Sequence, residues 1–297
     1  MDPVIEIVGL CKRFGSKQAV DHLSVSIPRG SIFAFLGDNG AGKTTTIRML
    51  TGLMRPDAGR SSILGQDCWK AAAALRHKVG YMPERPKFYD WMSVHELGWF
   101  TAGFHKAGFL ERYEQLAERY RLDAGAKLKH LSKGQYAKVA LALALAVDPE
   151  VLVLDEPTSG LDLLVRREVL GSMVDLAAEG RTILLSSHQI AEVERVATHV
   201  AFLASGKLLL TASMDELRQR VMRYRLRYEQ QAPDASPLGK VLERNGSGKL
   251  WQAVVLDPIR PAVEQLRDGE DVFDFEETPL NLEEVYCALL TQKEGRP

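Results

Sequence analysis

A continuous apolar run followed at once by a glycine-rich loop constrains this chain more than any other feature. Residues 32–36 read Ile-Phe-Ala-Phe-Leu, and residues 37–44 read Gly-Asp-Asn-Gly-Ala-Gly-Lys-Thr, which matches the pattern G-x-x-x-x-G-K-[ST]. An uninterrupted apolar run of strand length is typical of a parallel strand that is covered on both faces. The loop pattern requires a buried strand before it and a helix after it, and both are predicted here. These residues predict an α/β fold with a phosphate-binding (P-loop) motif at the end of a central strand.

Each residue type in this loop suits the binding of phosphate. Glycine tolerates positive φ and lets backbone N–H groups converge on phosphate oxygens, while the start of the next helix favours an anion. Lys43 supplies a positive charge, and Thr44 offers a hydroxyl to Mg²⁺. An ordinary glycine turn is the weaker alternative. We expect a nucleotide to be bound by Gly37, Asp38, Asn39, Gly40, Ala41, Gly42, Lys43, Thr44 and Thr45.

Further apolar runs repeat the character of residues 32–36, and helical patterns separate them. They span residues 151–154, 182–185 and 200–203. This alternation predicts a mostly parallel sheet wrapped by helices. The first thirty residues differ, because apolar and polar residues alternate on either side of a turn at Gly15 and Ser16. They predict an antiparallel N-terminal β-subdomain.

Between residues 92 and 146 the strand signals vanish. Apolar residues recur at helical spacing, as at Leu110, Tyr113 and Ala117, so a mostly helical insert is expected over residues 92–146. Core packing is the expected role of this apolar stripe, and a partner-binding face is the alternative.

The pattern changes again near residue 220. Tyr224, Leu226 and Tyr228 alternate with arginines and predict a strand. We therefore expect a main domain over residues 1–220 and a small accessory α+β unit over residues 221–297. The role of this unit stays open between regulation and support of a dimer.

Three local patterns fill in this C-terminal unit. Residues 251–256 predict another strand, residues 282–290 an amphipathic helix, and Asn245 with Gly246 a turn. Residues 246–249 also read Gly-Ser-Gly-Lys but continue with Leu250, which has no hydroxyl for a metal. Because this stretch lies between predicted strands, we interpret it as part of a hairpin.

Two acids directly follow the apolar run of residues 151–154. These are Asp155 and Glu156, and in open α/β sheets ligands bind beyond the carboxyl ends of the strands. Asp155 is suited to hold Mg²⁺, and Glu156 is suited to polarise an attacking water as a general base. A turn or a helix cap explains two such acids alone, but not their combination with a complete phosphate loop.

Charge and cysteine content exclude several classes of protein. The 297 residues include 38 Lys and Arg against 39 Asp and Glu, which argues against a protein that holds nucleic acid by bulk electrostatics. The three cysteines, Cys11, Cys68 and Cys287, lie far apart without a CxxC pair, so neither a disulfide framework nor a zinc site is expected. Since we find no signal-peptide pattern and no apolar stretch long enough to span a membrane, we expect a cytosolic protein.

Three more segments, in their order along the chain, complete a family pattern. Residues 131–135 read Leu-Ser-Lys-Gly-Gln, residues 159–162 read Ser-Gly-Leu-Asp, and His188 follows the apolar run of residues 182–185. With the phosphate loop and the acid pair, they resemble the nucleotide-binding subunit of ATP-binding-cassette transporters over residues 4–220. The segment 131–135 is similar to the family signature L-S-G-G-Q and departs from it only at Lys133.

This resemblance assigns roles to residues that carry little signal alone. It implies that Ser132, Gly134 and Gln135 bind the nucleotide held by an opposite protomer, that His188 contacts the γ-phosphate, and that Phe14 stacks on adenine. The local alternatives are a serine-capped helix start, a structural histidine and a core aromatic.

Glu84 departs from the family pattern. It stands where the family usually has a glutamine that contacts Mg²⁺ and the attacking water, and it resembles a subset of bacterial cassettes of the ABC-2 type. We expect Glu84 to take part in catalysis and in metal binding. The alternative is a surface glutamate after a proline turn.

The resemblance further implies a cytoplasmic ATPase subunit attached to the inner face of the cell membrane. It would bind ATP and Mg²⁺, form a homodimer or heterodimer of ATPase subunits, and power transport, with export favoured, through separate transmembrane permease subunits. No nucleic acid partner is expected. The alternatives are a soluble cassette ATPase that acts on nucleic acid or ribosomes, and a degenerate interaction module. Against the first, only 88 positions separate Lys43 from Leu131, and no sustained heptads are found between them.

Overall fold

The computed structural model describes residues 3–293, and the chain divides into two compact units, Met1–Thr211 and Ala212–Pro297. The change of sequence pattern near residue 220 falls inside the second unit. Helix α8 (Met214–Arg220) lies between the expected boundary after residue 220 and the observed boundary after residue 211. It leads directly into the first strand of the second unit.

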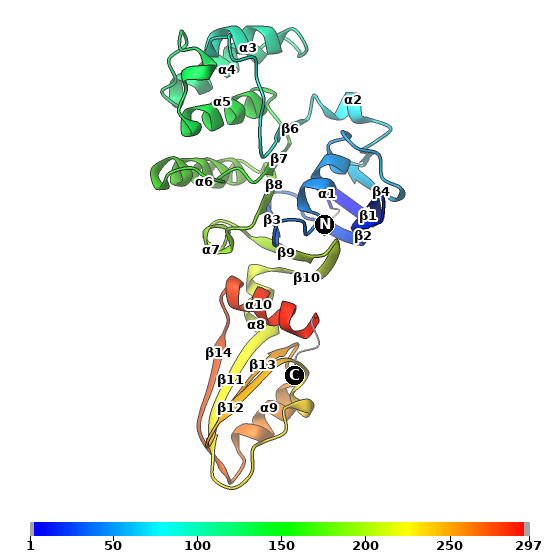
Figure 1. Cartoon of the computed structure of the whole chain (residues 1–297), viewed down its shortest axis with the longest axis vertical. Helices are drawn as coiled ribbons and strands as arrows, with labels where there is room; N and C mark the ends of the chain where they lie inside the picture. Colours follow the sequence, from blue (N-terminus) through cyan, green and yellow to red (C-terminus); the bar gives the residue numbers. More distant parts are fainter. Residues whose placement is uncertain (1–2, 294–297) are drawn as a thin grey trace. The chain divides into compact units, whose positions relative to one another are not determined.

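A six-stranded sheet forms the centre of the first unit (Figure 1). Its strand order is β10-β9-β3-β8-β7-β6, and the pairings of β9, β3, β8, β7 and β6 are parallel. The strands are β3 (Ile32–Leu36), β6 (Val79–Met82), β7 (Val151–Asp155), β8 (Thr182–Ser187), β9 (His199–Ala204) and β10 (Lys207–Ser213). Every residue of β3, β7 and β8 is buried, which confirms the α/β prediction made from the apolar runs.

This sheet contacts the helices α1 (Lys43–Leu50), α5 (Lys133–Ala146) and α6 (Leu163–Ala178). The short helix α7 (Ile190–Val193) follows β8. Because β3 runs straight into the phosphate loop and β7 ends at Asp155, the parallel sheet delivers both to the same edge.

An antiparallel sheet of order β2-β1-β4-β5 confirms the predicted N-terminal subdomain. It consists of β1 (Ile5–Phe14), β2 (Lys17–Ile27), β4 (Ala58–Ile63) and β5 (Gln66–Asp67). The expected turn at Gly15 and Ser16 joins β1 to β2. One apolar core contains residues of both sheets, among them Ile7, Val25 and Phe33.

The insert between β6 and β7 is helical, as predicted. It contains α3 (Val94–Ala102), α4 (Phe109–Arg119), the 3₁₀ helix η1 (Leu128–His130) and α5, and the short α2 (Ala72–Leu75) precedes β6. Tyr113 is fully buried and donates a hydrogen bond to the carbonyl of Val94 at 2.8 Å. A Cβ at Gly98 would collide with the Tyr113 ring. The apolar stripe of α4 therefore packs in the core of the insert.

The second unit is an antiparallel sheet of order β12-β13-β11-β14 with a core around Tyr224 and Trp251. Its strands are β11 (Val221–Tyr228), β12 (Lys240–Ser247), β13 (Leu250–Leu256) and β14 (Val272–Pro279). Its helices are α8, η2 (Ser236–Leu238), α9 (Arg260–Arg267) and α10 (Leu282–Lys293). The predicted strands over β11 and β13 and the C-terminal helix are confirmed.

The turn expected at Asn245 and Gly246 is wrong, because both residues pair with β13 inside β12. The hairpin turns instead at Gly248 and Lys249, where Gly248 has a φ of 60°. This confirms the hairpin interpretation of residues 246–249.

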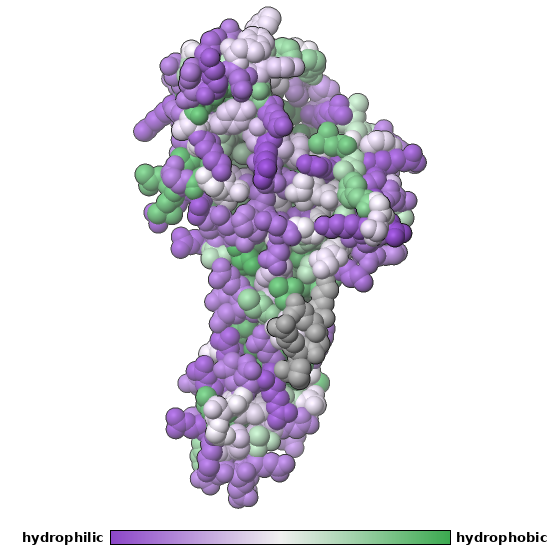
Figure 2. All heavy atoms as spheres, viewed as in Figure 1, coloured by the Kyte–Doolittle hydropathy of each residue, from purple (hydrophilic) through white to green (hydrophobic). Residues whose placement is uncertain are grey.

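Hydrophilic residues dominate the face of the molecule shown in Figure 2. Within residues 3–293, we find no helix that combines the length and the apolar character needed to cross a membrane.

Candidate active site

The loop between β3 and α1 forms a cradle that only glycine can line at two positions. Gly42 has a φ of 105°, and a Cβ there would lie 2.6 Å from the carbonyl oxygen of Ala19. A Cβ at Gly37 would collide with the carbonyl of Leu203. No side chain caps the N-terminus of α1. Its first N–H groups are therefore available to an anion.

Lys43 is buried at the base of this cradle. Its ammonium donates hydrogen bonds to the carbonyls of Gly37 and Asp38, and it lies 3.2 Å from Oε1 of Glu156. Only 5% of the Lys43 side chain and 7% of the Glu156 side chain are exposed. The carboxylate and the carbonyls hold this buried cation in place, so that its ammonium has little freedom to move.

Asp155 lies at the end of β7, directly across from the start of α1. Its Oδ1 accepts hydrogen bonds from the hydroxyl of Thr44 at 3.0 Å and from that of Ser186 at 2.6 Å. Burial raises the pKa of Asp155 above its usual value, and the two hydrogen bonds oppose this effect. Carboxylate and hydroxyl oxygens are the donors that Mg²⁺ prefers, so Thr44 and Asp155 fit this ion.

Glu156 bridges the cation of the loop and a histidine. Its Oε1 faces Lys43, and its Oε2 lies 2.7 Å from Nδ1 of His188. The backbone of Glu156 has a φ of 50°, and its N–H donates to the hydroxyl of Ser186 at 3.0 Å. A positive φ in a non-glycine residue costs free energy, and such strain is concentrated at functional sites. The arrangement leaves a buried carboxylate beside the phosphate cradle.

A cavity of about 380 Å³ opens onto these groups. Glu84 lines it, is 38% exposed and forms an ion pair of 3.4 Å with Arg85. Phe14 stands at the mouth with 47% of its surface exposed, which favours a ligand-stacking role over core packing. The full lining is Phe14, Lys17, Ala19, Asp38, Asn39, Gly40, Gly42, Lys43, Thr44, Thr45, Glu84, Arg85 and Glu156.

The signature residues do not line this cavity. Ser132 caps α5, since its hydroxyl accepts from the N–H of Gln135 while the Gln135 side chain accepts from the N–H of Ser132. Gly134 is buried against Val165, where a Cβ would approach to 3.0 Å. The structure thus brings together the loop, the two acids, His188, Glu84 and Phe14, and it leaves the signature apart from them.

Sequence reasoning missed four residues of the site, among them Ala19, which lines the cavity through β2. The Ser186 hydroxyl donates to the Asp155 carboxylate and accepts from the backbone N–H of Glu156, and its signal was a polar pair, Ser186 and Ser187, directly after the apolar run of residues 183–185. Lys17 and Arg85 line the cavity, but nothing in their local sequence distinguishes them from other surface cations.

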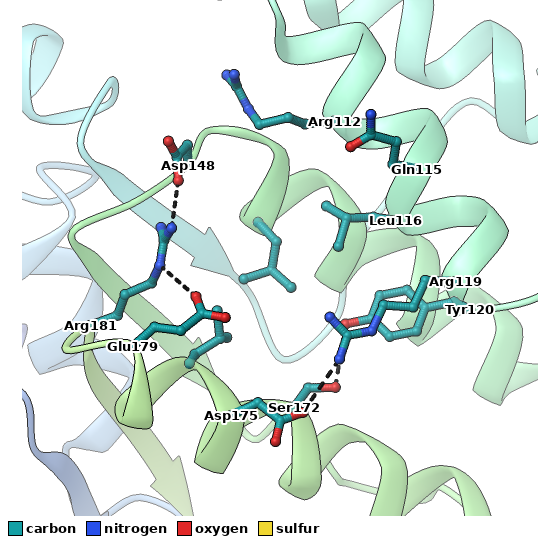
Figure 3. A pocket seen from close by; sticks show the side chains of 12 residues that line it. Arg112, Gln115, Leu116, Arg119, Tyr120, Asp148, Ser172, Asp175, Glu179 and Arg181 are labelled. Atoms are coloured by element: carbon teal, nitrogen blue, oxygen red, sulfur yellow. Dashed lines mark hydrogen bonds and ion pairs between the residues drawn. The ribbon is translucent and has the colours of Figure 1, made fainter.

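A second cavity, of about 310 Å³, lies between α4 and α6 (Figure 3). Arg119 pairs with Asp175 at 3.3 Å, and Arg181 pairs with Asp148 at 2.7 Å and with Glu179 at 3.5 Å. These charges neutralise one another. We therefore interpret this cavity as a seam between the insert and the core, and not as a site for a charged ligand.

Comparison with known proteins gives concordant matches. A family model described as ABC transporter matches residues 20–159. The bacitracin transport ATP-binding protein BcrA of Bacillus licheniformis is 36% identical over 228 residues, which are 75% of this chain and 74% of that protein. The daunorubicin resistance ATP-binding protein DrrA3 of Streptomyces coeruleorubidus is 35% identical over 73% of this chain and 70% of its own length.

Solved structures agree with these sequence matches. One described as the ATP binding subunit of an ABC transporter is 30% identical and superposes with a TM-score of 0.67 over 73% of this chain and 92% of that one. CbiO1 of Clostridium perfringens, described as part of the ABC transporter complex cbiONQ, is 28% identical with a TM-score of 0.64, over 73% of this chain and 90% of its own.

Proposed function

This chain belongs to the ABC transporter family as an ATP-binding subunit, and we propose that it drives export of a substrate by binding and hydrolysing ATP at the cavity beside Lys43. The observation that carries this proposal is the buried pair of Lys43 and Glu156 next to an uncapped helix start, with the exposed His188 in contact with the Glu156 carboxylate. The Nod factor export ATP-binding protein I of Ralstonia nicotianae, 37% identical over 72% of this chain and 68% of its own length, supports export as the direction of transport.

In the proposed site the glycine cradle and Lys43 hold the β- and γ-phosphates, and Phe14 stacks on the base. The oxygens of Thr44, Asp155 and Glu84 would hold Mg²⁺, which when bound neutralises charge on the phosphates. Burial disfavours the charged form of Asp155 in the free chain and therefore raises its pKa. A cation beside it would remove that cost.

We assign the proton transfer to Glu156. Its carboxylate takes a proton from the water that attacks the γ-phosphorus, and ADP leaves with the broken P–O bond. Lys43 stabilises the charge that develops on the phosphoryl oxygens. His188, 2.7 Å from the other carboxylate oxygen, holds Glu156 in position and contacts the γ-phosphate.

The signature of one chain would complete the site of a second copy or of a similar subunit. This follows from the separation of Ser132 and Gly134 from the cavity, together with the exposure of Ser132 on the outside of the unit. ATP would then lie between the phosphate loop of one subunit and the start of α5 of the other.

Separate membrane subunits would dock on the helical insert from the cytoplasmic side of the membrane. An exposed aromatic patch on α3 and the segments before and after it, made of Tyr89, Trp91, Phe100 and Phe104, supports this. Neighbouring ring centroids in the patch are 5.4–6.1 Å apart. Exposed aromatic clusters of this kind are typical of protein interfaces.

The proposal is tested with Glu156→Gln. We expect ATP binding to persist and hydrolysis to slow by ~10²-fold or more, the usual scale for the loss of a general base. The matched control is Glu150→Gln, which changes an exposed glutamate just before the other end of β7 and should leave the rate unchanged. Hydrolysis at the parent rate in Glu156→Gln would refute the assignment of the base.

A further inference from the structure

A bulge in the ribbon of β1 and β2 gathers three metal-ligating side chains outside the nucleotide site. The register pairs Leu10 with Leu23 but Lys12 with Val20, so Cys11 stands opposite two residues, Asp21 and His22. In a regular strand, neighbouring side chains point to opposite faces. Here His22 adopts a φ of 50°, and this left-handed residue lets both side chains reach the side of Cys11.

The three groups are already in contact. The backbone N–H of His22 donates to Sγ of Cys11 at 3.2 Å, and Nδ1 of His22 lies 2.8 Å from Oδ1 of Asp21. One ligand atom from each of the three residues lies within 4.8 Å of the other two. Within residues 3–293, no other group of three such side chains meets this criterion.

We propose that Cys11, Asp21 and His22 form a site for a zinc ion. A thiolate, an imidazole and a carboxylate are the donor set that Zn²⁺ accepts, and a thiolate disfavours Mg²⁺ and Ca²⁺. Three protein ligands leave a fourth tetrahedral position for water. Cys11 loses its thiol proton when the ion binds, and the N–H donated by His22 stabilises the resulting thiolate.

Access and charge are compatible with this site. The side chain of His22 is 82% exposed, so its ring is free to turn towards an ion that enters from solvent, whereas Cys11 is buried behind it. Lys207 lies 3.2 Å from Oδ2 of Asp21, and Oδ1 contacts Nδ1 of His22, so a turn of the exposed imidazole ring towards the ion would free Oδ1 for the metal.

The sequence pointed away from zinc because it contains no paired cysteines. The site depends on two neighbouring residues of one strand facing the same way as a cysteine on the next strand. That arrangement exists only because of the bulge, which the alternating pattern of the ribbon does not predict.

The test is a titration of the full chain with Co²⁺, without nucleotide and with excess Mg²⁺ to saturate oxygen-only sites. We expect one equivalent to produce a thiolate-to-cobalt charge-transfer absorption, and Zn²⁺ to displace it. Cys11→Ser should abolish this band. The control, Cys287→Ser, changes a free cysteine that is exposed and should leave the band intact.

A second variant covers the case in which Cys11→Ser disturbs the buried ribbon. His22→Asn removes the imidazole from an exposed position, and asparagine tolerates the same positive φ, so the fold should be kept. We expect Co²⁺ affinity to fall at least tenfold while ATP binding and the far-ultraviolet circular dichroism stay unchanged. Absence of the band in the parent chain, equal affinity in His22→Asn, or loss of the band in Cys287→Ser would overturn the proposal.

Discussion

Two helices of the first unit begin at loops that we propose to contact the nucleotide, and their N-termini differ. At α1 the N-cap is Gly42, no side chain caps the helix, and the buried Lys43 and Glu156 lie beside the open N–H groups. At α5 the N-cap is Ser132, which forms a complete capping box with Gln135. The N-terminus of α1 leaves backbone N–H groups for an anion, whereas the side chains of Ser132 and Gln135 bind backbone N–H groups at the N-terminus of α5.

This difference shows what each start requires from outside. At α1 the cation already has partners in Glu156 and two backbone carbonyls, but no side chain caps the first N–H groups of the helix, so an anion that binds there gains these donors. At α5 the capping box stabilises the start of the helix without a ligand, and Gly134 adds no side chain there. The proposed γ-phosphate contact at α5 therefore comes from another subunit.

The largest effect should come from the α1 side. Lys43→Ala removes a buried charge-assisted interaction with phosphate, which is typically worth about 1.5–3 kcal/mol, so we expect ATP affinity to fall by about 10- to 100-fold. Equilibrium titration with ATP measures it. The control is Lys249→Ala, in the other Gly-Ser-Gly-Lys stretch, where Lys249 is exposed in a hairpin turn. An unchanged affinity in Lys43→Ala would remove the distinction between the two helix starts.

A substitution at the start of α5 should weaken the association of two subunits and leave ATP binding to the monomer unchanged. Ser132→Arg places bulk and charge where a second subunit would bring its nucleotide, so the ATP-dependent dimer should be lost while the affinity of the monomer is kept. Losing the cap costs about 1 kcal/mol of stability. Ser213→Arg controls for this cost, because Ser213 forms the equivalent capping box on α8. Size-exclusion chromatography with ATP distinguishes them, and a dimer that survives in Ser132→Arg contradicts the account.

Glu84 tests a smaller part of the α1 side. Glu84→Gln keeps an oxygen for Mg²⁺ or water but loses the charge, so we expect substantial ATPase activity with a raised Mg²⁺ requirement. Glu84→Ala loses both oxygen and charge, and its turnover should fall while ATP binding persists. The measurement is ATPase rate against Mg²⁺ concentration, and three superimposable curves would make Glu84 a solvated turn residue.

The smallest effect concerns stability. Because burial raises the pKa of Asp155, its ionisation destabilises the free chain, and this cost grows as the pH rises through its pKa in the folded state. Without metal or nucleotide, Asp155→Asn should raise the melting temperature near pH 7 by a few degrees, the effect of about 1 kcal/mol. The gain should shrink as the pH is lowered through that pKa. A constant difference at all pH values would show that charge is not the cause.

The same contrast explains what the sequence could predict. At α1 the chemistry is local: a strand, a glycine loop and a lysine follow one another, and the parallel sheet then brings Asp155 and Glu156 to the same edge. The pattern at α5 resembles any serine-capped helix, so its role rested on family resemblance. Ser186 was missed because its partners are 30 and 31 residues away in sequence, on the neighbouring strand.

The C-terminal unit was predicted less completely for a physical reason. Strand β14 was missed because it is an acidic strand at the edge of its sheet with no buried residues. Helix α9 was missed because it has only 8 residues, of which Val263 is buried. Alternation of apolar and polar residues is a weak signal in a strand that buries neither of its faces. The misplaced turn at Asn245 and Gly246 has the same origin, because β12 is also an edge strand and its end is exposed.

Mixing two inactive variants tests most directly whether the two helix starts act in different subunits. Lys43→Ala keeps an intact α5 start, and Ser132→Arg keeps an intact α1 site. If the two starts meet across an interface, a mixed pair contains one complete site, so ATP hydrolysis in the mixture should rise well above that of either variant alone. If both starts serve the same nucleotide within one chain, no complete site can form, and the mixture should stay as inactive as its components.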